Sequence, residues 1–146
     1  MKLESYCCGF AFAGEMSVLL IQKKRPAWMS GMWNGIGGHV EDGEAVIDSM
    51  VREFLEETGV QTKADDWRGF CLLSHRFRDK TCLIQFFAHT KILDGAPKTM
   101  SDEQISWIAV PDIVLGRINV VPNLKYLVPA ALCPDASSMT VHTRSF

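Results

Sequence analysis

The segment spanning residues 35–59 constrains the fold more than any other part of the chain. Between residues 45 and 58, apolar side chains recur at spacings of three and four, which predicts an amphipathic helix with one buried face. The apolar residues of that face are Val46, Ile47, Met50, Val51, Phe54 and Leu55. Gly59 follows directly, at the position where a glycine commonly ends a helix. Asp42-Gly43 predicts a turn in front of the helix.

The remaining elements favour one α/β domain with a mixed sheet over residues 1–146. Before the helix, the pattern predicts a hairpin over 5–22 with strands at 6–13 and 18–22, a loop over 23–35, and a strand over 36–40. After the helix, it predicts strands over 68–77, 81–91 and 104–110, and a helix over 123–132 interrupted at Pro129. Residues 133–146 lack periodicity, and we expect a loosely packed tail there.

Composition excludes several classes of partner. The net charge of -2 gives no bulk attraction to nucleic-acid backbones or anionic membranes, so we expect neither as a partner. No apolar stretch is long enough to span a membrane, and the beginning of the chain does not resemble a signal peptide. The five cysteines show no C-x-x-C spacing, which favours reduced, mostly buried thiols in a cytoplasmic protein. The sequence leaves the oligomeric state open.

The predicted helix also carries an acidic face. Glu53, Glu56 and Glu57 lie at i, i+3 and i+4, so a helix brings their like charges together, where they repel. Arg52 can reach Glu56 but does not neutralise three carboxylates. The simplest interpretation is a solvated acidic surface. The glycine-rich run at 35–38 favours a different one, because glycines let the backbone approach a ligand closely. A hard divalent cation such as Mg²⁺ would compensate these charges.

Residues 38–60 resemble the Nudix box, G-x5-E-x7-R-E-U-x-E-E-x-G-U, in which U is a bulky apolar residue. The fixed positions are occupied by Gly38, Glu44, Arg52, Glu53, Glu56, Glu57 and Gly59. Phe54 fills the first U, where a smaller aliphatic residue is more usual. The resemblance implies the α/β/α sandwich of the Nudix fold. It also implies a Mg²⁺-dependent hydrolase, in which Mn²⁺ can substitute, that cleaves a phosphoanhydride in a nucleoside diphosphate linked to another group.

The resemblance also implies roles for the residues of the box. Glu56 and Glu57 would bind the metal together with the carbonyl of Gly37. Glu53 would be either a metal ligand or the general base that activates water. Arg52 would orient a catalytic glutamate through a charge-assisted hydrogen bond, and Glu44 would support the cluster.

Two loops outside the box contribute further candidates. Family members commonly supply a metal-binding or base glutamate from the region before the 104–110 strand, where Glu103 is our first candidate and Asp102 the second. The alternative is a surface acid. Lys23 and Arg25, with Lys24 between them, are candidate contacts for substrate phosphates, and the alternative is a solvated basic loop.

The substrate is predicted from the residues around the box. The run from Trp33 and Asn34 to Gly38 is similar to the W-N-G-x-G-G of MutT-like and oxidised-purine triphosphatases, in which the Asn lies in the base pocket. An amide can both donate to and accept from a purine edge. Mammalian oxidised-purine triphosphatases, which the later residues also resemble, have an acid that contacts the base near the position of Asn123 and a Trp near that of Val121. Asn123 is therefore a second candidate contact for the base, in a pocket that differs from theirs. Candidate stacking surfaces are Trp28, Trp33 and Phe87, and the alternative for each is packing in the core or in a loop.

These features favour a (deoxy)nucleoside triphosphate, with an oxidised purine among the candidates, hydrolysed to a nucleoside monophosphate and pyrophosphate. One alternative within the same fold is an ADP-ribose or dinucleotide pyrophosphatase. The other is a non-catalytic Nudix-fold module that binds a nucleotide for regulation.

Overall fold

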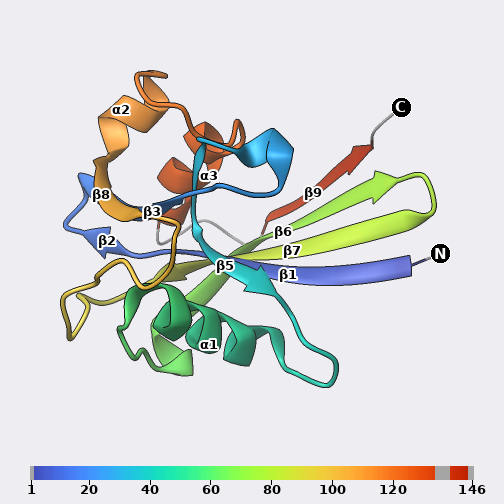
Figure 1. The fold of residues 1–146 in the computed structure, drawn as a ribbon, viewed down its shortest axis with the longest axis horizontal. Coiled ribbons are helices and arrows are strands. Elements are labelled where there is room, and N and C mark those ends of the chain that lie inside the picture. The colour runs from blue at the N-terminus through green and yellow to red at the C-terminus, as the bar shows by residue number, and fades with distance from the viewer. Residues whose placement is uncertain (1, 134–138, 145–146) are drawn as a thin grey trace.

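A five-stranded mixed sheet forms the centre of the molecule (Figure 1), in a computed structural model that describes residues 2–133 and 139–144. In spatial order its strands are β5 (Ile36–His39), β1 (Lys2–Phe10), β7 (Lys80–His89), β6 (Trp67–Phe77) and β9 (Met139–Arg144). The pairs β1/β7 and β6/β9 are parallel, whereas β1/β5 and β6/β7 are antiparallel. The predicted mixed sheet is therefore confirmed.

A second, smaller sheet lies beside the first. It consists of β2 (Phe12–Ala13), β3 (Ser17–Gln22), β4 (Trp33–Asn34) and β8 (Ile105–Ala109), and β8 pairs with β3. The predicted hairpin over 5–22 is wrong for most of its length, because β1 pairs with β5 and β7 and only Phe12 and Ala13 pair with β3. Alternation marks a segment as a strand but does not identify its partner.

Helices cover both faces of the central sheet (Figure 1). The helix α1 (Val46–Thr58) packs on β5 and β1, and α2 (Val110–Val114) and α3 (Leu124–Ala131) lie on the opposite side. Both predicted helices are confirmed. However, α3 continues through Pro129, because its buried face, which includes Leu124, Leu127 and Val128, holds it against the sheet. The sequence did not predict α2, in which Pro111 lies in the first turn, where proline is tolerated.

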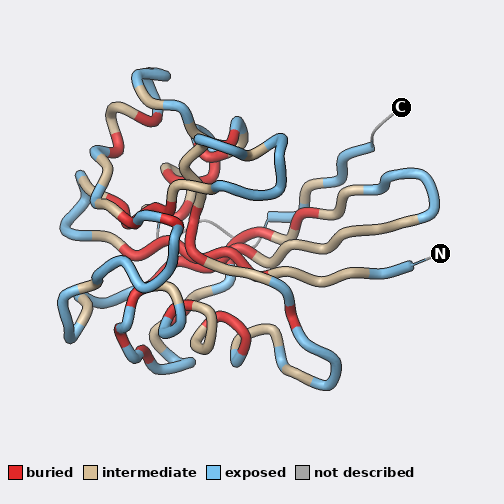
Figure 2. Tube along the Cα trace, in the orientation of Figure 1, coloured by how far each residue is buried: buried red, intermediate tan, exposed pale blue. Residues whose placement is uncertain are grey.

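Two hydrophobic clusters stabilise these layers. Figure 2 shows that the buried stretches of the chain lie mainly in the middle of the molecule and the exposed ones in the outer loops. In the cluster under α1, Met50 and Phe54 are fully buried. The ring of Phe54 meets that of Trp67 edge-on, with 5.1 Å between centroids. Leu55, predicted on the buried face, is 39% exposed. The buried stripe therefore sets the orientation of α1 and directs its acidic face toward β5 and the loops beyond.

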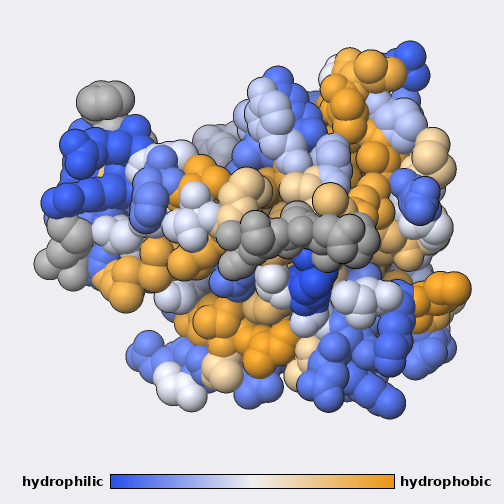
Figure 3. Space-filling model, turned by 180° about the vertical axis from the view of Figure 1, so that it is seen from behind, coloured by the Kyte–Doolittle hydropathy of each residue, from blue (hydrophilic) through white to orange (hydrophobic). Residues whose placement is uncertain are grey.

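Residues 139–144 correct the prediction of a loose tail over 133–146. They form β9, which pairs in parallel with β6, so that Val141 lies opposite Leu73 and packs against the core. The rest of that predicted tail after Cys133 lies outside the described residues. Seen from behind (Figure 3), apolar side chains form several groups separated by polar ones.

The loop and cysteine predictions were partly confirmed. The predicted loop over 23–35 contains the 3₁₀ helix η1 (Ala27–Met29) and the short strand β4, and a second 3₁₀ helix, η2 (Ala64–Asp66), precedes β6. All five cysteines are free, and Cys7, Cys8 and Cys71 are buried. No helix among the described residues is long and apolar enough to cross a membrane.

Candidate functional site

The glycines of β5 allow α1 to pack closely on the sheet. Gly38 lies under Glu53, and a Cβ at Gly38 would overlap the Glu53 carboxylate. A Cβ at Gly37 would overlap the backbone carbonyl of Cys7 on β1. The Glu53 side chain is 13% exposed in this position. The glycine run therefore brings a carboxylate of α1 directly against the backbone of β5.

Arg52 organises the acidic residues of the box. Its guanidinium binds Glu44 through two hydrogen bonds, from Nε at 2.8 Å and from Nη2 at 2.9 Å. It also donates from Nη1 to Glu53 at 2.9 Å and from Nη2 to the His39 carbonyl at 3.1 Å, whereas its contact with Glu56 is long, at 3.5 Å. The hydrogen bonds from Arg52 lower the pKa of Glu44 to about 2. Arg52 thus joins α1 to the turn that precedes it and contacts Glu53, the glutamate that we expect it to orient.

The other box carboxylates are less well compensated. Burial raises the pKa of Glu53, although Arg52 opposes it, and the negative charges of Glu56 and Glu44 raise it further. Burial likewise raises the pKa of Glu57, and the charge of Glu103 adds to the effect. Glu56 points to solvent, with 57% of its side chain exposed. Two carboxylates on adjacent helical turns, one mostly and one partly buried, therefore favour a nearby cation.

The carboxylates on this face of α1 could hold a divalent ion. Among the described residues, no three acidic, histidine or cysteine side chains are already arranged around a metal position. Mg²⁺ needs fewer protein ligands, because it usually takes one or two carboxylates and completes its shell with waters and substrate phosphates. The hard oxygen atoms of Glu53, Glu56 and Glu57 fit that requirement.

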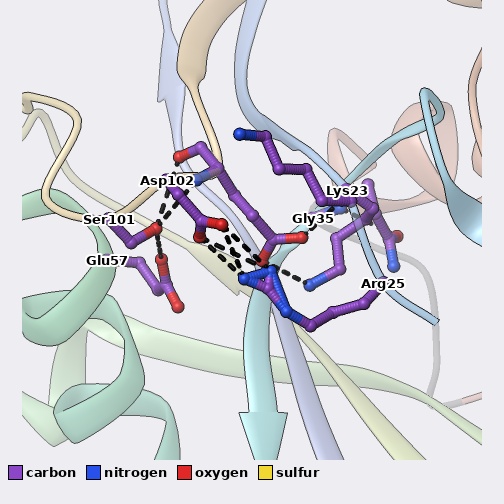
Figure 4. A network of polar contacts seen from close by, with 9 residues as sticks. Lys23, Arg25, Gly35, Glu57, Ser101 and Asp102 are labelled. Carbon is purple, nitrogen blue, oxygen red and sulfur yellow. Dashed lines mark hydrogen bonds and ion pairs between the residues drawn. The ribbon is translucent and has the colours of Figure 1, made fainter.

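The loop at 101–103 lies between the acidic helix and the basic loop at 23–25 (Figure 4). Glu103 is buried and accepts hydrogen bonds from Lys23 Nζ at 2.9 Å and from the Lys24 amide at 2.6 Å. Burial acts to raise the pKa of Glu103, but these hydrogen bonds outweigh it and hold the pKa below its ordinary value. Glu103 is thus held as a carboxylate by the 23–25 loop.

The second acid of this loop pairs with the second cation. The guanidinium of Arg25 contacts both carboxylate oxygens of Asp102 at 2.8 Å, on the surface of the molecule. The sequence predicted Lys23 and Arg25 as phosphate contacts and Glu103 and Asp102 as metal or base candidates. The structure brings all four together but pairs them with one another, so any phosphate contact by Arg25 or Lys23 competes with a carboxylate.

Ser101 connects this loop to the helix, and the sequence did not predict it. Its hydroxyl donates to Glu57 Oε2 at 3.3 Å and accepts from the Glu103 amide at 3.1 Å. The sequence did contain a signal for the contact with the Glu103 amide, because a short hydroxyl side chain commonly accepts a hydrogen bond from the backbone amide two residues later. The contact with Glu57, 44 residues away, depends on the fold.

The predicted base-binding residues occupy neighbouring segments. The backbone of Trp33 bonds to Asn119 and Val121, each at 2.9 Å, which places the segment before α3 beside β4. Asn34 Oδ1 accepts the Gly35 amide at 2.9 Å. Asn123 Oδ1 is buried and has no hydrogen-bond partner in the described part of the chain. An unpartnered buried acceptor favours a ligand that donates to it.

The three candidate stacking surfaces lie in different settings. Phe87 packs in the core under α1, so the prediction of a stacking role for it is wrong. Trp28 is 62% exposed on η1, and Trp33 is half-buried on β4.

Comparison with known proteins places this arrangement in a family. The NUDIX domain family matches residues 6–130. Two curated relatives, the Nudix hydrolase YvcI of Bacillus subtilis and the oxidized purine nucleoside triphosphate hydrolase of Mus musculus, are each 51% identical over 43 residues, or 30% of this chain. These matches span 25% and 27% of the relatives' own length.

A solved structure shares the fold over nearly the whole chain. The MutT mutator protein from Bacillus halodurans aligns with a TM-score of 0.75 and 21% identity, over 95% of this chain and 89% of that chain. The layers of this chain, a mixed sheet with helices on both faces, are those implied by the resemblance of residues 38–60 to the Nudix box. Since the family match runs from β1 into α3, this chain belongs to the NUDIX domain family.

Proposed function

We propose that this chain is a divalent-metal-dependent hydrolase, using Mg²⁺ or Mn²⁺, that cleaves a nucleoside triphosphate to a nucleoside monophosphate and pyrophosphate. The observation that carries the proposal is the pair of neighbouring, partly to mostly buried carboxylates, Glu53 and Glu57, whose pKa values burial raises. They lie on one face of α1 beside the surface-exposed Glu56. A bound cation would relieve this charge, and the membership of the chain in a hydrolase family supports the same interpretation.

We assign a separate role to each residue of the site. Glu56 and Glu57, with the Gly37 carbonyl, would hold the metal, which when bound lowers the pKa of a bound water and neutralises phosphate charge. Glu53, fixed by Arg52 and lying over Gly38, would accept the proton of the attacking water. Glu44 holds Arg52 from the other side. Glu103 already accepts two hydrogen bonds from the 23–25 loop, so we assign it to holding that loop rather than to proton transfer.

The base would bind between β4 and the start of α3. Asn34 has its Oδ1 engaged by the Gly35 amide, which leaves its NH₂ group to donate to the base. Asn123 Oδ1 offers a buried acceptor for an N–H of the base. A purine edge carrying both an N–H and a C=O matches this pair. The mouse relative is an oxidized purine nucleoside triphosphate hydrolase, and an oxidised purine nucleotide is therefore the first substrate to assay.

The test is a chromatographic screen of nucleotides with Mg²⁺. The panel includes dGTP, 8-oxo-dGTP, dATP, 2-oxo-dATP and ADP-ribose, and Glu53→Gln and Glu57→Gln serve as matched inactive variants. We expect a triphosphate to be converted to monophosphate and pyrophosphate by the wild type and not by the variants. Conversion of ADP-ribose alone would contradict the substrate class, and turnover equal to that of both variants would contradict the enzyme.

A further inference from the structure

We propose that Ser101 is a positioning residue that fixes the orientation of the Glu57 carboxylate and thereby sets the affinity of the site for its divalent cation. The inference rests on the proposed metal-dependent function. It assigns a role to a side chain outside the box, on a loop that the sequence places 44 residues from Glu57.

The contacts of Glu57 single out Ser101. Glu44 and Glu53 are both held by the guanidinium of Arg52. Glu57 lacks that support, and Ser101 is its hydrogen-bond donor in the described part of the chain, at 3.3 Å. A half-buried carboxylate with a single donor has more than one rotamer available, so removing that donor releases it.

The hydroxyl is itself held in place. It accepts the amide of Glu103 at 3.1 Å, and its other acceptor, the Glu103 carbonyl, is more distant at 3.5 Å. Of the two acceptors within reach of the hydroxyl proton, Glu57 Oε2 at 3.3 Å is nearer than the Glu103 carbonyl at 3.5 Å. Glu103 is in turn anchored by Lys23 and by the Lys24 amide. Ser101 therefore connects a loop that is anchored at the buried Glu103 to a carboxylate of α1 (Figure 4).

The same loop offers a matched control. Thr99 Oγ1 accepts the amide of Ile105 at 3.1 Å, so it also braces the loop through a side-chain-to-backbone hydrogen bond. No contact between Thr99 and a carboxylate of α1 is found among the described residues. Thr99→Ala should loosen the loop as Ser101→Ala does, while leaving the donor to Glu57 in place.

The experiment compares the wild type with Ser101→Ala, Ser101→Thr and Thr99→Ala. Mn²⁺ binding to the protein alone is measured by electron paramagnetic resonance, and hydrolysis of dGTP is measured as a function of Mg²⁺. Ser101→Ala should weaken Mn²⁺ binding and raise the half-saturating Mg²⁺ concentration by about tenfold, as is common when a group that orients a metal ligand is removed. The KM for dGTP at saturating Mg²⁺ should stay close to that of the wild type. Ser101→Thr, which retains the hydroxyl, should restore both metal readouts, and Thr99→Ala should leave both unchanged.

Three results would overturn the proposal while leaving the proposed function intact: Ser101→Ala with wild-type affinity for Mn²⁺, failure of Ser101→Thr to restore it, or an equal loss in Thr99→Ala. A wild-type protein that neither binds Mn²⁺ nor hydrolyses dGTP or any other nucleotide of the screen would instead overturn the proposed function and this inference with it.

Discussion

Replacing Gly38 with alanine should separate the position of the Glu53 carboxylate from the stability of the fold. A Cβ at Gly38 would overlap the Cδ and both oxygens of the Glu53 carboxyl group. These atoms are the far end of a flexible side chain, so the carboxylate can move while β5 and α1 remain in place. The expected result is a protein that folds but holds Glu53 in the wrong position.

The cost of this movement follows from what Glu53 gives up. Its hydrogen bond from Arg52 Nη1 is 2.9 Å long, and the Arg52 side chain is 26% exposed. Hydrogen bonds to charged groups contribute about 1.5–3 kcal/mol, and partial exposure favours a loss of about 1–1.5 kcal/mol here. For a chain of this length, that corresponds to a fall of about 2–6 °C in Tm. A misplaced reacting group costs on the order of 100-fold in kcat.

Two other alanine variants serve as controls, with thermal unfolding and nucleotide hydrolysis measured for each. In Gly37→Ala the new Cβ meets the backbone carbonyl of Cys7, which cannot rotate away, so we expect a loss of about 3 kcal/mol or more in the free energy of unfolding. In Gly95→Ala the nearest atoms are methyl groups of Val60 at 3.7 and 3.8 Å, and both readouts should match the wild type. If Gly38→Ala retains wild-type kcat, the placement of Glu53 over Gly38 as a reacting group is refuted.

Three further predictions concern metal, pH and the last strand. Burial raises the pKa of Glu53 and Glu57, so the metal-free protein loses stability as pH rises through their folded-state pKa values. Mg²⁺ should therefore raise Tm more at neutral than at acidic pH. An equal rise in Tm at both pH values would contradict the proposed metal site. Hydrogen bonds from Lys80, Tyr6 and Lys2 lower the pKa of Glu4 from 4.5 to about 2. These bonds therefore stabilise the folded protein above the unfolded-state pKa of Glu4, and this stabilisation is lost as pH falls toward 2. Urea unfolding should therefore show a smaller loss of stability on acidification in Glu4→Gln than in the wild type. Val141→Asp should lower the free energy of unfolding by about 1–3 kcal/mol by placing a charge against the core, whereas Thr140→Asp, at an exposed position of the same strand, should have little effect.

Local patterns in the sequence predicted most of the elements that position the site. The helix over 45–58, the strand that leads into it and the two long strands after it are all present, because hydrophobic periodicity and glycine or turn residues mark such elements directly. The short helix α2 was missed, because its five residues give too short a pattern to recognise. The strand β9 was missed for a related reason, since most of its side chains are exposed and the segment lacks an apolar alternation.

The pairing of strands was beyond what the sequence could indicate. The chain passes from β1 to β2 within a few residues, yet these strands belong to different sheets. The parallel contact of β1 with β7 joins residues that are far apart in sequence, and hydrogen bonds between strands carry no local signature. The predicted hairpin was wrong for this reason.

Residues 38–60 by themselves determined that Glu53, Glu56 and Glu57 share one face of a helix with Arg52 beside them, because helical spacing alone puts these residues together. Only the tertiary structure decided how their charges are compensated. It pairs Glu103 with Lys23, and it brings Ser101 to Glu57 from a distant loop. Charges and hydrogen-bond donors interact through space, and their neighbours are set by how the layers pack, which no local pattern records.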